Sequence, residues 1–170
     1  MSIIKHKAQR VAVLIDAQNM YHSAKHLYNA RVNFKELLKT AVAGRQLIRA
    51  TSYVIRTESG EEKPFLEALE KIGIETRIKD LQIFPGGVKK ADWDVGIAID
   101  AIRFAPNVEA VVLVSGDGDF IPLLEYLRNV RGTQVEVMAF GRSTSQRLKE
   151  AADDFTDLGT EPRKYLLHIK

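Results

Sequence analysis

The sequence contains no cysteine among its 170 residues. This absence excludes a disulfide framework, a thiolate metal site and a cysteine nucleophile. No apolar run approaches the ~18 residues of a membrane-spanning helix, and the N-terminus lacks the apolar core of a signal peptide. We therefore expect a cytoplasmic protein that does not enter a membrane.

Histidine is scarce, with four residues scattered along the chain. Only His22 and His26 have the i, i+4 spacing that places two side chains on one face of a helix. No glutamate lies between them, so the pattern of the zinc proteases is absent. The pair therefore favours a solvated helix surface over a metal site.

What is present is typical of one globular domain. Apolar residues make up 45% of the chain and charged residues 28%, which is enough to bury a core. We expect a flexible N-terminal arm over residues 1–10, one domain over 11–160 and a C-terminal tail over 161–170. The net charge of +3 and a pI near 9.1 suit an anionic partner without requiring one.

Two apolar runs end abruptly in polar residues. Residues 111–114 read Val-Val-Leu-Val and are followed by Ser-Gly-Asp-Gly-Asp, after which leucines at helical spacing begin. Residues 11–15 read Val-Ala-Val-Leu-Ile and are followed by Asp-Ala-Gln-Asn. Apolar runs without alternation are typical of strands buried on both faces of a parallel sheet. We therefore expect a strand, a polar turn and a helix at both places.

The remaining pattern alternates strands with helices. We expect further strands over 48–55, 74–78, 81–84 and 134–140, and a short one within the tail that begins at 153. Helices are expected after Asp16, after an Asn33 cap, over 65–72, over 95–104 and, capped by Ser143, over 144–152. The helix over 95–104 is apolar nearly all round and is expected to be well buried. This alternation predicts an α/β fold, with a Rossmann-like parallel sheet of about five or six strands and helices on both faces.

Such a sheet collects polar side chains where its strand order reverses. If the strands over 11–15 and 111–114 are neighbours, four residues converge there, and Asp94 at a helix start could join them. The four are Asp16, Asn19, Asp117 and Asp119. Two carboxylates ~4 Å apart repel by roughly 4 kcal/mol at an effective dielectric of ~20, so the cluster needs a counter-charge. Hard oxygen ligands favour Mg²⁺ or Mn²⁺, which can activate water for phosphodiester hydrolysis.

These motifs resemble the NYN domain, in particular its LabA-like branch, a relative of the PIN nuclease fold. The resemblance covers about residues 11–158 and rests on Asp16-x-x-Asn19, on Asp94-Val95 opening an apolar helix, and on the Ser-Gly-Asp-x-Asp-Phe run at 115–120. It implies a PIN-like sheet and a Mg²⁺ or Mn²⁺ site that cleaves RNA. It implies a catalytic set of Asp16, Asn19, Asp94, Asp117 and Asp119, the four aspartates being the metal ligands. Many members have a Lys-Gly-Val-Asp-Val run where this chain reads Lys-Lys-Ala-Asp-Trp-Asp at 89–94, which adds Asp92.

Each acid also has a structural interpretation. Asp16, Asp94 and Asp119 could cap helices, and Asn19 could be a turn residue or orient a water. Asp92 is favoured as a solvated cap and Asp100 as a structural residue that needs a partner, since a lone buried carboxylate is costly. Ser115 could form a local hydrogen bond or orient Asp117. Trp93 could stack on a base or pack its helix onto the sheet.

Substrate contacts are expected from cations and hydroxyls near the site, namely Lys89, Lys90, Arg142, Ser143 and Thr144. The leading hypothesis is a metal-dependent ribonuclease acting on single-stranded or structured RNA. The first alternative is a non-catalytic RNA-binding or regulatory module that keeps the acidic site. The second is an aspartyl phosphohydrolase, which is disfavoured because Ala17 and Gln18 follow Asp16 where a second acid is needed. The sequence leaves open whether the chain forms a homodimer.

Overall fold

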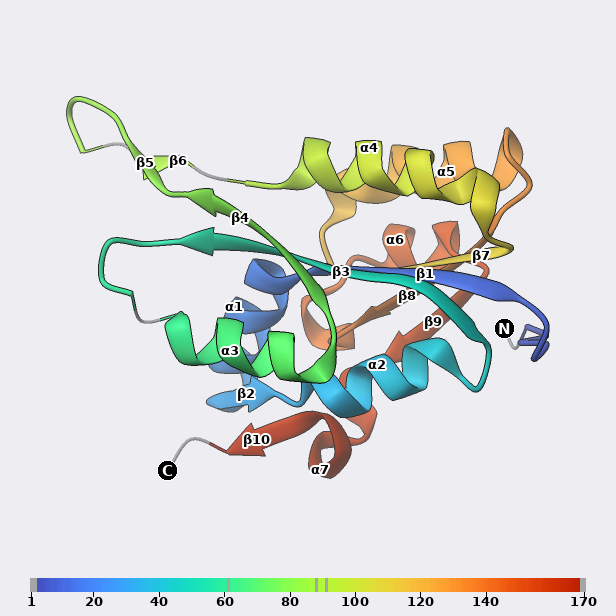
Figure 1. The fold of residues 1–170 in the computed structure, drawn as a ribbon, viewed down its shortest axis with the longest axis horizontal. Helices are drawn as coiled ribbons and strands as arrows, with labels where there is room; N and C mark the ends of the chain where they lie inside the picture. The colour runs from blue at the N-terminus through green and yellow to red at the C-terminus, as the bar shows by residue number, and fades with distance from the viewer. Residues whose placement is uncertain (1–2, 61, 88, 91, 169–170) are drawn as a thin grey trace.

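The computed structural model describes residues 3–60, 62–87, 89–90 and 92–168, with the backbone alone at 89–90. Its centre is a six-stranded sheet in the order β4-β3-β1-β7-β8-β9, and every neighbouring pair is parallel (Figure 1). The strands are β1 (Arg10–Asp16), β3 (Gln46–Arg56), β4 (Glu75–Asp80), β7 (Ala110–Val114), β8 (Gln134–Ala139) and β9 (Asp154–Asp157). The predicted α/β parallel sheet is therefore confirmed.

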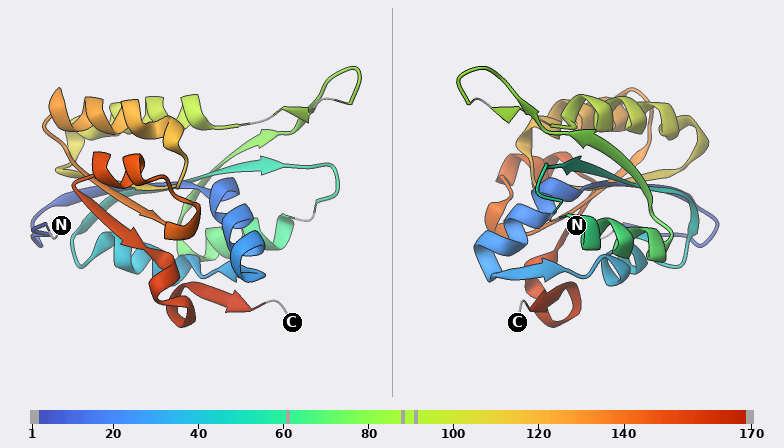
Figure 2. Two further views of the ribbon diagram at one scale, coloured as in Figure 1. Left: turned by 180° about the vertical axis from the view of Figure 1, so that it is seen from behind. Right: turned by 60° about the vertical axis from the view of Figure 1, so that its left-hand side comes forward.

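Helices cover both faces of this sheet (Figures 1 and 2). One face carries α1 (Ala17–Tyr28), α2 (Phe34–Val42) and α3 (Lys63–Ile72); the other carries α4 (Asp94–Phe104), α5 (Ile121–Asn129) and α6 (Gln146–Ala151). Four short 3-10 helices lie between the described elements: η1 (Ala105–Asn107) after α4, η2 (Gly118–Phe120) before α5, η3 (Gly141–Ser143) after β8 and η4 (Leu158–Thr160) after β9. The arrangement is the doubly wound architecture expected from the alternation of strands and helices.

The sheet separates two apolar cores because side chains alternate along each strand. In β1, Val11, Val13 and Ile15 point into the core under α1, α2 and α3, whereas Ala12 and Leu14 point into the core under α4, α5 and α6. All five are fully buried. Burial on both faces explains why these strands read as continuous apolar runs.

Small elements lie outside the main sheet. The chain end folds into α7 (Pro162–Tyr165) and β10 (Leu166–His168), and β10 pairs antiparallel with β2 (Ala30–Val32). A second pair, β5 (Gln82–Ile83) with β6 (Lys89–Lys90), forms a hairpin that projects from the body (Figures 1 and 2). No helix in the described part of the chain is long and apolar enough to cross a membrane.

The short strand expected in the tail is confirmed as β9, a full member of the main sheet. Two other expectations need correction. The cap of α6 is Ser145, whose Oγ accepts the Leu148 N–H at 3.2 Å, and not Ser143, which lies in η3. Helix α4 is not buried all round, because Val95 and Ile99 on its outer face remain exposed.

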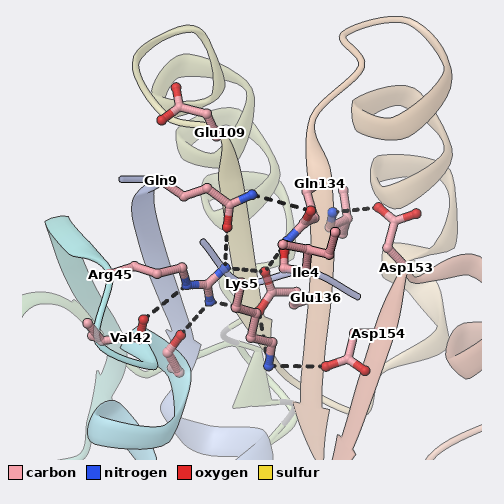
Figure 3. Close-up of polar contacts among 12 residues, drawn as sticks. Ile4, Lys5, Gln9, Val42, Arg45, Glu109, Gln134, Glu136, Asp153 and Asp154 are labelled. Atoms are coloured by element: carbon pink, nitrogen blue, oxygen red, sulfur yellow. Dashed lines mark hydrogen bonds and ion pairs between the residues drawn. The ribbon is translucent and has the colours of Figure 1, made fainter. Parts of the chain in front are cut away.

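A buried ion pair lies near the end of the sheet where its strands begin (Figure 3). Arg45 precedes β3, and its two terminal nitrogens meet both carboxylate oxygens of Glu136 in β8 at 2.7 and 2.9 Å. Other donors of Arg45 bind the carbonyls of Val42 and Ala41 at the end of α2 and the side-chain oxygen of Gln9 at 3.2 Å. Lys5 from the N-terminal segment adds an ion pair to Glu136 at 3.6 Å. The network ties three distant parts of the chain together.

Candidate metal centre

The strand order reverses between β1 and β7, at the centre of the sheet. The two strands are in register, with Ile15 opposite Val114. The next residues, Asp16 and Ser115, therefore lie side by side at this edge of the sheet. The predicted neighbourhood of these two strands is confirmed, and it is the position at which doubly wound sheets bind ligands.

Asp16 and Ser115 are joined by a hydrogen bond. Ser115 Oγ donates to Asp16 Oδ2 at 2.9 Å, and Asp16 Oδ1 accepts the backbone N–H of Asn19 at 3.3 Å. Asp16 is thus the N-cap of α1 and a partner of β7 at once. Burial raises the pKa of Asp16 above its ordinary value, and these two hydrogen bonds offset only part of that rise. The link between Asp16 and Ser115 was missed from the sequence, although each is the first polar residue after an apolar run.

Further hydrogen bonds set the turn after β7. Asn19 Oδ1 accepts the Gly116 N–H at 3.0 Å, and Ser115 Oγ accepts the Asp117 N–H at 3.2 Å. Asp117 Oδ1 in turn accepts the Asp119 N–H at 2.9 Å. The Asn19 side chain therefore holds the backbone of the turn. The Ser115 hydroxyl both binds Asp16 and orients Asp117.

Three carboxylates converge at this turn. Asp94 comes from the first turn of α4, while Asp117 and Asp119 follow β7, and one oxygen of each lies within 4.8 Å of the other two. None of the ion pairs among the described residues includes these three acids. Asp16 lies beside this group and is not one of the three. Its expected role as a ligand stays a prediction.

The crowding of negative charge changes the acidity of Asp94. Burial, and then the charge of Asp117, raise the pKa of Asp94 to about 7, with smaller contributions from Asp16 and Asp92. Like charges in one site disfavour simultaneous ionisation, so Asp94 is only partly ionised at neutral pH, and a bound cation would favour its ionised form.

The start of α4 is fixed by Trp93. Its Nε1 donates to the Val54 carbonyl of β3 at 3.0 Å, and its ring packs on Tyr53 with 5.4 Å between ring centroids. Lys79 from β4 lies 4.3 Å from the centroid of the Trp93 ring and donates to the Asp92 carbonyl at 3.1 Å. Trp93 is 8% exposed. The packing role of Trp93 therefore accounts for its position, and its ring is not open for base stacking in this conformation.

Asp100 holds the middle of the same helix. Its carboxylate accepts from the Tyr53 hydroxyl at 2.8 Å and pairs with Arg77 of β4 and, at 3.3 Å, with Arg103. Asp100 thus has the partners that a buried carboxylate requires. Asp92 is exposed and accepts the Asp94 N–H at 3.1 Å through Oδ1, as a solvated cap would.

The expected substrate residues divide into two groups. Thr144 lies against the turn, because a Cβ placed on Gly116 would be 2.7 Å from Thr144 Oγ1. The hydroxyls of Ser143 and Thr144 both donate to the Phe140 carbonyl, and the guanidinium of Arg142 lies 5.8 Å from the centroid of the Tyr28 ring. The side chains of the second group, Lys89 and Lys90, lie outside the described residues. Substrate binding by these residues stays a prediction.

The donor set fits a hard divalent cation. Asp94, Asp117 and Asp119 offer carboxylate oxygens only, which Mg²⁺ and Mn²⁺ prefer over softer nitrogen and sulfur ligands. None of the ion pairs among the described residues includes these three acids, so their negative charge has no counter-ion within the described part of the chain. A divalent ion at this group would supply one.

This fold and this acidic turn define a class of Rossmann-like proteins with an acidic centre at the reversal of the strand order. The chain belongs to the NYN domain family, whose sequence model matches residues 10–159. The resemblance inferred from the motifs is therefore confirmed.

Two individual proteins are similar over nearly the whole chain. The "Low amplitude and bright protein LabA" of Synechococcus elongatus is 26% identical over 167 residues, which span 89% of this chain and 85% of that protein. The crystal structure of VPA0982, a protein of unknown function from Vibrio parahaemolyticus, superposes with a TM-score of 0.86 at 32% identity. That match covers 97% of this chain and all of VPA0982. The chain is thus an NYN domain protein of the LabA-like kind.

Proposed function

We propose that this protein is a metal-dependent ribonuclease. The observation that carries the proposal is the convergence of Asp94, Asp117 and Asp119 within 4.8 Å at the centre of the sheet. These three residues would hold Mg²⁺ or Mn²⁺, which when bound provides a Lewis acid for phosphodiester hydrolysis. Membership of the NYN family supports RNA as the substrate.

The other residues of the site maintain its shape. Ser115 keeps Asp16 and Asp117 in fixed positions, and Asn19 holds the backbone of the turn. Burial and the charge of the neighbouring acids raise the pKa of Asp94 to about 7, so a cation bound there would favour release of its proton. Affinity for Mn²⁺ should therefore rise between pH 6 and 8. Arg142 and the lysines at 89 and 90 are proposed contacts for RNA phosphates, which would make RNA affinity fall with salt.

The alternative of a non-catalytic RNA-binding or regulatory module is favoured by one observation. Asp16 accepts two hydrogen bonds and lies beside the three-acid group. A site with three ligands can retain a metal ion without the geometry needed for turnover. The phosphohydrolase alternative is disfavoured, because the Asp16 side chain that would be its nucleophile is buried, with 8% exposure.

The test is cleavage of labelled single-stranded and hairpin RNA with Mn²⁺, with Mg²⁺ and with EDTA. Asp117→Asn and Asp94→Asn should each reduce cleavage at least about 100-fold, a loss typical of removing one electrostatic catalytic group. Asp80→Asn, at an exposed ion pair with Arg56, is the matched control and should leave cleavage unchanged. Salt-sensitive RNA binding without any cleavage would favour the module, and full activity in Asp117→Asn would refute the nuclease.

A further inference from the structure

Helix α4 presents an apolar stripe to the outside. Val95 is 70% exposed, Ile99 is 58% exposed and Ile102 is 39% exposed. Their spacing of four and then three residues places them on one narrow face of the helix. The opposite face of α4 is fully occupied, since its buried side chains, Ile97, Ala101 and Phe104, pack into the core over the sheet. The helix therefore has a second apolar face that no described part of the chain covers.

A second apolar surface lies on the hairpin that precedes α4 in the chain. The β5–β6 hairpin projects beyond the N-terminal end of α4, on the side of the sheet that α4 occupies (Figures 1 and 2). Its strands have two residues each, and Ile83 and Phe84 are 55% and 44% exposed. A two-stranded hairpin is marginal in water without packing against another element.

We propose that these surfaces form an interface between two copies of this chain, related by a two-fold axis. The α4 helices pack antiparallel, so that Ile99 meets the partner's Ile99 and Val95 meets the partner's Ile102. In coiled coils, helices pair along apolar residues that are spaced alternately by four and three positions. An interface of this kind is self-complementary, because each contact occurs twice across the axis.

The charges beside the stripe fit the antiparallel arrangement. Arg103 lies in the last turn of α4, and exposed Asp92 precedes its first turn. Antiparallel packing brings Arg103 of one copy towards Asp92 of the other, and it also opposes the two helix dipoles. RNA does not fit this stripe, because three aliphatic side chains offer neither positive charge nor an aromatic ring for stacking.

The area is sufficient for a weak dimer. Taking about 100 Å² of apolar area for one fully exposed aliphatic side chain, the stripe and the hairpin tip supply roughly 300 Å² per copy. Two copies then supply roughly 600 Å² of apolar area, which corresponds to about 1,000 Å² in total because interfaces are near 60% apolar. That value is at the lower limit for a specific interface, so we expect a dissociation constant in the micromolar range.

The absence of native cysteine makes a direct test simple. Ile99→Cys places a single thiol on the two-fold axis, and mild oxidation should convert most of the protein into a covalent dimer. Val130→Cys is the matched control, since Val130 is 67% exposed but lies outside the proposed interface. Equal cross-linking of the two variants, or none at position 99, would overturn the proposal.

Sedimentation velocity gives an independent measurement. The unmodified chain should show a concentration-dependent rise from monomer to dimer across the micromolar range. Ile99→Asp should weaken the dimer at least tenfold while leaving the thermal unfolding midpoint within a few degrees, because the side chain is exposed. A chain that stays monomeric at about 100 μM overturns the interface, and so does a dimer that Ile99→Asp leaves intact. Loss of RNA binding in a monomeric Ile99→Asp variant would instead assign the stripe to RNA.

Discussion

The Ser115 hydroxyl donates to Asp16 across the boundary between β1 and β7, with 2.9 Å between Ser115 Oγ and Asp16 Oδ2. The contact joins the two central strands at the point where their polar turns begin. It also places the hydroxyl oxygen where it accepts the Asp117 N–H. One small side chain therefore connects both halves of the acidic centre.

Ser115→Ala should destabilise the fold in a pH-dependent manner. The substitution leaves Asp16, which is 8% exposed, without its side-chain donor. We therefore expect the free energy of unfolding at pH 7, measured with urea, to fall by about 1–3 kcal/mol. Without that donor the already raised pKa of Asp16 rises further. The loss should therefore be smaller at pH 4, where more of the buried carboxyl is protonated.

The control for this prediction is Ser23→Ala. Ser23 also shares a hydroxyl hydrogen bond, with Ser143 at 3.1 Å, but that contact is exposed. A change within about 0.5 kcal/mol is expected there. An equal loss in Ser115→Ala at both pH values would contradict a role that acts through Asp16.

Asp94→Asn should stabilise the metal-free protein at high pH. The folded chain retains the Asp94 proton up to about pH 7, whereas the unfolded chain releases it near 3.8. The contribution of Asp94 to the free energy of unfolding therefore decreases as the pH rises from about 4 to 7. Above pH 7 this destabilisation is complete. Because water partly screens this half-buried site, we expect Asp94→Asn to gain about 1 kcal/mol at pH 8 and nothing at pH 4.

Unfolding in EDTA at both pH values measures that difference. Glu67→Gln, at an exposed position on α3, is the control and should show no pH-dependent gain. With Mn²⁺ added at pH 8, the native chain should become more stable than Asp94→Asn, since only the native chain keeps the full metal site.

Gly116→Ala should be poorly tolerated, although Gly116 is not among the glycines with a positive φ. A new Cβ would lie 2.7 Å from Thr144 Oγ1 and 3.3 Å from the Ser143 carbonyl oxygen. Thr144 cannot simply turn away, because it is buried and its hydroxyl donates to Phe140. Overpacking of this kind costs about 1–3 kcal/mol. Combining Gly116→Ala with Thr144→Ala should cost less than the sum of the two single changes in denaturant unfolding, and additive costs would show that the two residues do not touch.

Glu136→Gln should be the most destabilising of these changes. It leaves the Arg45 guanidinium, whose side chain is fully buried, without its counter-charge. Breaking a buried pair in this way costs about 3–5 kcal/mol. The matched change is Glu109→Gln at the exposed pair with Arg10, for which less than about 1 kcal/mol is expected. Similar midpoints for the two variants in urea would show that the buried pair contributes little.

Much of the fold could be predicted because the central strands are buried on both faces. Apolar runs such as 11–15 and 111–114 have few alternative structures. Strand β9 was harder to assign, since Asp-Phe-Thr-Asp at the sheet edge is half-buried and has the composition of a loop. The exposure of Val95 and Ile99 was also not predictable, because periodicity indicates a helix but not what packs on its outer face.

The acidic centre shows the same division. The order of the motifs predicted which carboxylates follow the strands, and strand pairing brings those turns together. It could not show which oxygen atoms converge, because that depends on side-chain hydrogen bonds between distant segments. Asp16 is turned towards Ser115, whereas Asp94 from α4 meets Asp117.

The pair formed by Arg45 and Glu136 lies near the beginning of the strands, and the acids lie where the strands end. Cohesion and the proposed metal binding are thereby assigned to opposite margins of one sheet. Replacing an acid of the three-acid group removes repulsion and leaves the far anchor intact. Single substitutions there can therefore abolish the proposed activity and still leave a folded protein.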